Sequence, residues 1–144
     1  MADILSRETR PSDELLTFTG WEGPAILATA QRRNASRFFY PFPLHLRGHF
    51  KDQAWSEIAD ALEGPVPIRG VLTEAVGVPV PPGGATVEWA LTNLDRALIP
   101  GAMTDGSIPL ARRRVREIML RDYRIEHCER AICLLTAVDR TRGR

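Results

Sequence analysis

A continuous apolar run near the end of the 144-residue chain, Ala131–Val138 (AICLLTAV), is the strongest constraint on the fold. Its Ile, Thr and Val residues favour extended backbone. An apolar strand without alternating polar positions is typical of a strand that is buried on both faces. The run therefore predicts a central strand of a sheet.

The rest of the chain is divided into short segments by glycine and proline. Alternating or helical spacing of apolar residues predicts strands over 14–21, 38–50 and 66–80, and helices over 24–33, 52–62 and 109–121. The 24–33 segment also fits a second hairpin strand. Residues 85–98 fit two patterns, and we favour a strand to Leu91 followed by a short helix from Asn93 over one continuous helix.

These segments predict one α+β domain. Strands and helices alternate only in part, and several prolines favour positions at sheet edges. We therefore expect a single two-layer domain, a mostly antiparallel sheet with packed helices, spanning residues 14–139. Residues 1–13 are polar and aperiodic and predict a flexible N-terminal arm, and residues 140–144 predict a basic C-terminal tail.

The segment Phe38–Phe50 (FFYPFPLHLRGHF) predicts an edge strand with a candidate binding face. Pro41 and Pro43 share one parity, so their missing N–H groups lie on the same side of the strand. The face that they share also carries the candidate binding residues Phe39, His45, Arg47 and His49. Aromatic and arginine side chains beside each other are typical of an interface core. The alternatives are a solvated polar face, a contact with an anion or nucleic acid, and a metal or acid–base site, for which the sequence shows no third ligand.

Charge is unevenly distributed along the chain. The formal net charge is +1, but residues 1–111 hold 9 basic and 13 acidic side chains, whereas residues 112–144 hold 10 and 5. The excess centres on a predicted helix, where the candidate binding residues are Arg112, Arg113 and Arg116. Arginine forks suit phosphates and carboxylates, so this face fits a protein partner or a nucleic acid. The alternative is a solvated face with local pairs such as Arg113–Glu117.

The cysteines and histidines provide little evidence of catalysis. Cys128 and Cys133 are too few for a disulfide framework and lack C-x-x-C spacing, so we expect reduced thiols in a cytoplasm-like compartment. The chain contains no phosphate-loop, dinucleotide-binding, serine-hydrolase or zinc-protease motif. We therefore predict no catalytic residue, no metal site and no cofactor. A small enzyme that uses His45, His49 or His127 is the alternative.

Together these features favour a non-catalytic binding or assembly subunit that docks a protein partner or a further copy of itself in a larger complex. A nucleic-acid-associated protein that uses the Arg112–Arg116 helix face is the alternative binding function. We expect no membrane association, because no apolar run reaches the length of a bilayer span and the first residues do not resemble a signal peptide. The expected location is cytoplasmic, or virion-associated for a structural protein.

Overall fold

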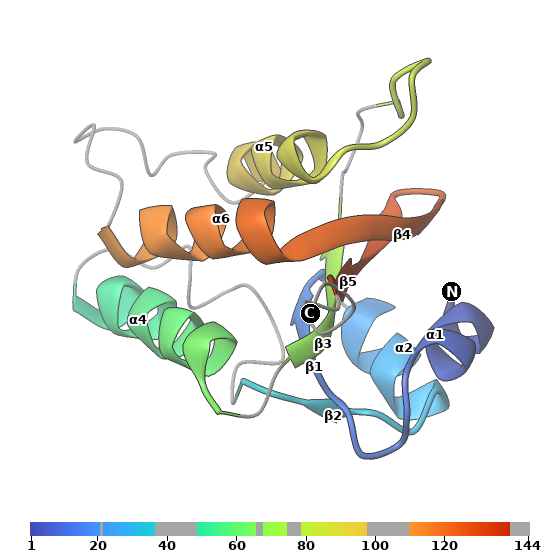
Figure 1. The fold of residues 1–144 in the computed structure, drawn as a ribbon, viewed down its shortest axis with the longest axis horizontal. Helices are drawn as coiled ribbons and strands as arrows, with labels where there is room; N and C mark the ends of the chain where they lie inside the picture. The colour runs from blue at the N-terminus through green and yellow to red at the C-terminus, as the bar shows by residue number, and fades with distance from the viewer. Residues whose placement is uncertain (21, 37–48, 66–67, 75–78, 98–109, 139–144) are drawn as a thin grey trace, which may run out of the picture.

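The computed structural model describes residues 1–20, 22–36, 49–65, 68–74, 79–97 and 110–138 (Figure 1). The helices in these ranges are α1 (Ala2–Glu8), α2 (Glu22–Thr29), α4 (His49–Glu63), α5 (Val87–Ala97) and α6 (Leu110–Asp122). The strands are β1 (Glu14–Phe18), β2 (Arg33–Asn34), β3 (Ile68–Glu74), β4 (Tyr123–Glu129) and β5 (Ile132–Ala137).

The strands form one five-stranded sheet in the order β2-β1-β3-β5-β4. β1 pairs in parallel with β2 and β3, and β5 pairs antiparallel with β3 and β4. The prediction of a single α+β domain with helices packed on a sheet is confirmed. The sheet is mixed rather than mostly antiparallel, because α2 and α4 each return the chain to the same end of the sheet.

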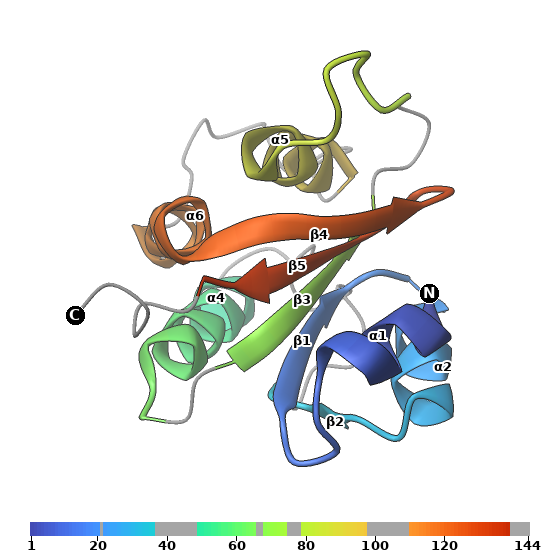
Figure 2. The ribbon, with the colours of Figure 1, turned by 45° about the vertical axis from the view of Figure 1, so that its right-hand side comes forward.

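Helices cover both faces of the sheet, so the domain has three layers rather than the two predicted (Figure 2). One face packs against α1 and α2, and the other against α4, α5 and α6. The sheet is covered on both faces because successive residues of its central strands point to opposite faces and are both apolar and buried. Leu134 of β5 packs in the core beneath α1 and α2, and Leu135 packs in the core beneath α4–α6.

Elements with a strong local signal match their predictions. β5 is a central strand, and its residues Ile132–Thr136 are buried. α4 buries the predicted stripe around Trp55, Ile58 and Ala59, although the helix begins at His49 rather than at Asp52. α6 follows its predicted bounds closely.

Two predicted elements are wrong, and a third lies mostly outside the described residues. Within the expected N-terminal arm, α1 buries Leu5 completely. The 85–98 segment forms the helix α5 without a preceding strand, because its stripe packs on the sheet. Of the predicted edge strand, residues 38–48 lie outside the described ranges, and His49 and Phe50 belong to α4. The boundaries of the domain and tail, 14–139 and 140–144, stay predictions.

The two cysteines form a disulfide, which corrects the expectation of reduced thiols. Cys128 and Cys133 are direct partners across the β4–β5 hairpin, with their Cα atoms 4.1 Å apart and an S–S bond of 2.03 Å. Cys133 is buried in the core, as its apolar surroundings predict. The pairing depends on hairpin register, which five-residue spacing alone does not reveal. A cytoplasm-like location therefore loses the support of free thiols and stays a prediction.

Burial of Tyr123 makes the fold sensitive to alkaline pH. The Tyr123 hydroxyl donates a hydrogen bond of 2.8 Å to the Ile68 carbonyl, and burial raises its pKa from 10.0 to about 12. The folded state therefore favours the neutral phenol, and this stabilisation is complete below pH 10 and is lost as the pH rises towards 12. We expect the free energy of unfolding to fall by about 2 kcal/mol more across this range in the wild type than in Tyr123→Phe, measured by urea denaturation. Equal slopes for the two proteins would contradict this assignment.

Candidate functional site

The predicted arginine helix, α6, is held between α4 and α5 on one face of the sheet (Figure 1). Its inner side carries Val115, Ile118 and Met119, all buried in the core. These positions follow the helical period, which explains why this segment is an amphipathic helix. The remaining positions are directed to α4, to α5 or to solvent.

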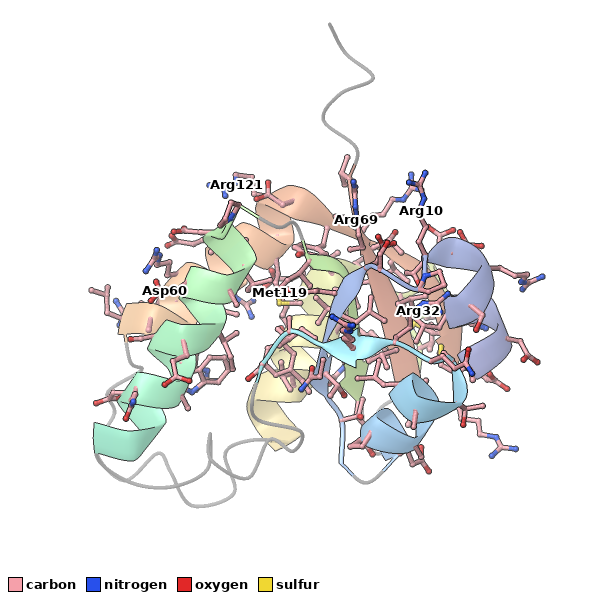
Figure 3. The ribbon with its side chains drawn as sticks, turned by 90° about the horizontal axis from the view of Figure 1, so that it is seen from below. Arg10, Arg32, Asp60, Arg69, Met119 and Arg121 are labelled. Carbon is pink, nitrogen blue, oxygen red and sulfur yellow. A yellow bond between two sulfur atoms is a disulfide. The ribbon has the colours of Figure 1, made fainter. Side chains whose placement is uncertain are left out.

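Arg114 connects α6 to α4. Its guanidinium forms an ion pair of 3.1 Å with Asp60 and a second, shorter one with Glu63 (Figure 3 labels Asp60). The hydrogen bond from Arg114 lowers the pKa of the Glu63 carboxyl, and the same bond raises the pKa of Arg114. Because these groups are exposed, the pair orients the two helices more than it stabilises them.

Two of the candidate arginines also have partners within the domain. The Arg112 guanidinium lies 5.8 Å from the ring centre of Trp55, and Arg116 forms an ion pair with Glu88 of α5. The carboxylates of α4 and α5 therefore flank the α6 arginines on both sides. The face is a mixed-charge surface and not a continuous basic one.

The outer face of α6 is formed by Leu110, Arg113, Glu117 and Leu120, which lie within an arc of about 80° at 3.6 residues per turn. All four are exposed, Leu110 by 81% and Leu120 by 42%. Leu110 is exposed, although its helical spacing also fits the buried stripe of Val115, Ile118 and Met119. In the described part of the chain, Arg113 and Glu117 have no ion-pair or hydrogen-bond partner, so the expected Arg113–Glu117 pair is absent there.

The other candidate site residues are not brought to this face by any described contact. Phe39, His45 and Arg47 lie outside the described residues, and His49 lies in the first turn of α4. His127 is half-buried on β4, opposite Leu134 of β5. Over the described ranges, no group of histidine, cysteine and carboxylate side chains is suited to hold a metal ion.

Glu129, two residues after His127 on β4, contacts the N-terminus of the chain. Its carboxylate accepts a hydrogen bond of 2.5 Å from the amino group of Met1. This bond is the main cause that lowers the pKa of Glu129, and the charge of His127 is a minor one. The contact fixes the start of α1 against the β4–β5 hairpin.

Sequence patterns also missed a polar pocket of about 300 Å³ between the α1–β1 loop and the sheet. Its lining includes Arg10, Arg69 and Arg124, which come from widely separated parts of the chain (Figure 3 labels Arg10 and Arg69). Glu126 accepts hydrogen bonds from Arg124 at 3.3 Å and from Thr136 at 3.1 Å. Only the strand order brings these residues together, so no sequence spacing reveals the pocket.

Comparisons with known proteins return no relative: no family model, no curated protein and no solved structure matches the chain. Among the helices of the described ranges, none combines the length and apolar character that crossing a bilayer requires. The function is therefore inferred from the residues and their geometry.

Proposed function

We propose that the protein is a non-catalytic assembly subunit that docks a protein partner through the outer face of α6. The observation that carries this proposal is the exposure of Leu110 and Leu120 on one side of the helix, with Arg113 and Glu117 between them. Two leucines about 15 Å apart, at 1.5 Å per residue, enclosing a charged pair have the composition of a docking helix. Burial of two leucine side chains favours association by about 3 kcal/mol before ordering costs.

A second contact of the same subunit through the predicted Phe39–His49 face stays a prediction. The nucleic-acid alternative is weakened by Asp60, Glu63 and Glu88, because these carboxylates already bind α6 arginines and would repel phosphates. The enzyme alternative gains no support from the geometry around His127, the only histidine whose side chain lies in the described part of the chain.

A photo-crosslinking amino acid at position 113 of the full chain, irradiated in an extract of the cells that produce the protein, tests the proposal. We expect a discrete protein adduct at position 113 and none of that mass when the probe replaces the exposed Arg130 on the β4–β5 hairpin. Excess purified wild type should compete for the adduct, whereas a Leu110→Asp/Leu120→Asp variant should not. Identical adducts from positions 113 and 130 would contradict the proposal.

A further inference from the structure

The outer face of α6 has an internal symmetry that specifies a partner. Leu110 and Leu120 lie five positions before and after Val115, and Arg113 and Glu117 lie two positions before and after it. The order Leu, Arg, Glu, Leu is therefore self-complementary when the helix is laid against a reversed copy of itself. A twofold axis needs this property, because residue i must contact residue j of the other copy, and residue j must contact residue i.

We propose that the partner of this face is a second copy of the chain, with the two α6 helices packed antiparallel about a twofold axis opposite Val115. This inference rests on the proposed docking role of α6. In this register Leu110 packs on Leu120 of the second copy, and Arg113 pairs with Glu117 of the second copy. Each contact occurs twice in the dimer.

Charge complementarity favours a second copy of the chain over an unrelated protein as the partner of this face. Across the described residues, Arg113 and Glu117 have no partner within their own protomer, whereas Arg112, Arg114 and Arg116 contact α4 or α5 and Arg121 pairs with Asp122. An antiparallel copy supplies an opposite charge to each of them, whereas a parallel copy places arginine beside arginine. The same pairing covers both exposed leucines, which otherwise remain in contact with water.

The small area of one helix face limits the expected affinity of the dimer. A single helix pair buries less than the roughly 800 Å² per partner of a standard interface, so we expect a weak dimer with a Kd on the order of 10–100 µM. The full chain should therefore sediment near 16.1 kDa at low concentration and approach twice that mass when concentrated. Unchanged monomer mass up to about 500 µM would overturn the proposal.

Charge reversal tests the register. Arg113→Glu and Glu117→Arg should each weaken dimerisation about tenfold, because each places like charges opposite each other twice. An equimolar mixture of the two variants should recover a dimer of near wild-type affinity. In the mixed dimer, both contacts between positions 113 and 117 join a glutamate of one variant to an arginine of the other. Repulsion within one helix is unchanged by mixing and cannot produce this recovery. Failure of the mixture to associate more tightly than either variant alone would overturn the antiparallel register.

Two controls complete the experiment. Arg130→Glu, an exposed charge reversal on the hairpin, should leave the dimer unchanged, and circular dichroism should show each variant folded. A monomeric protein whose position 113 still crosslinks to another protein overturns the second copy as partner but leaves the docking function standing. A monomeric protein without a specific crosslink overturns both.

Discussion

Replacing Arg32 with alanine is expected to lower the free energy of unfolding by about 3 kcal/mol, which is a large part of the stability of a domain of this size. The guanidinium donates to four oxygens at once: the Thr9 hydroxyl at 2.8 Å and the carbonyls of Ala30 at 2.6 Å, Ser6 at 3.1 Å and Thr9 at 2.6 Å. These carbonyls lie at the C-terminal ends of α1 and α2, where helices leave acceptors unpaired. One positive charge thus stabilises two helix ends (Figure 3 labels Arg32).

Urea denaturation followed by circular dichroism measures this loss. Arg32→Lys should lie between the wild type and Arg32→Ala, because lysine keeps the charge but not the planar fork. Arg33→Ala is the matched control, since Arg33 is an exposed neighbour on β2, and it should change stability by less than about 0.5 kcal/mol. Equal effects at positions 32 and 33 would refute the role of Arg32 as a cap of both helices.

Gly23→Ala is the second substitution with a large expected effect, a loss of about 3 kcal/mol. Gly23 is buried in the first turn of α2, directly over the end of β1. A Cβ atom at this position would lie 1.9 Å from Thr19 Oγ1 and 2.2 Å from Thr17 Oγ1. Both threonines are buried, and their hydroxyls share a hydrogen bond of 2.9 Å, so neither can move aside without losing a partner.

The stability loss expected for Gly23→Ala is steric, so removing the clashing threonine hydroxyl groups tests its cause. Adding Thr17→Ala and Thr19→Ala to Gly23→Ala should recover part of the stability lost to the clash, as measured by thermal unfolding. Gly83→Ala is the control, because a Cβ atom there meets no other atom within 4 Å. If Gly23→Ala unfolds at the wild-type temperature, α2 does not sit on β1 as closely as the structure shows.

Elements whose signal is local could be predicted from the sequence. The apolar run of β5 and the helical stripes of α4 and α6 each carry enough information within one segment. The stripe of α5 is ambiguous because Val87 and Leu91 fit both a strand face and a helix face, and only packing on β3 decides between them. β4 is an edge strand with charged residues, so its sequence resembles a polar connector.

Features that depend on distant residues could not be predicted. α1 is ordered by the guanidinium of Arg32, which lies more than twenty residues further along the chain. The candidate arginines of α6 lie on a helix and outside its buried stripe, as expected, but Trp55 and Glu88, which contact Arg112 and Arg116, belong to other helices. The residues of the outer face of α6 are spaced by three, four and three positions, and this spacing is visible in the sequence. Leu110 fits both this outer face and the buried stripe of α6, and only the packing of α6 on the sheet decides between them.

The order of the strands also has a consequence for synthesis. β5 is the last of the described strands along the chain, yet it lies inside the sheet between β3 and β4. Leu134 and Leu135 contribute to the cores on opposite faces, so neither core is complete while residues 132–137 are missing. Ribosomes therefore release most of this domain before it can close, and a chain halted ahead of Ile132 exposes the edge of β3 to aggregation and proteolysis.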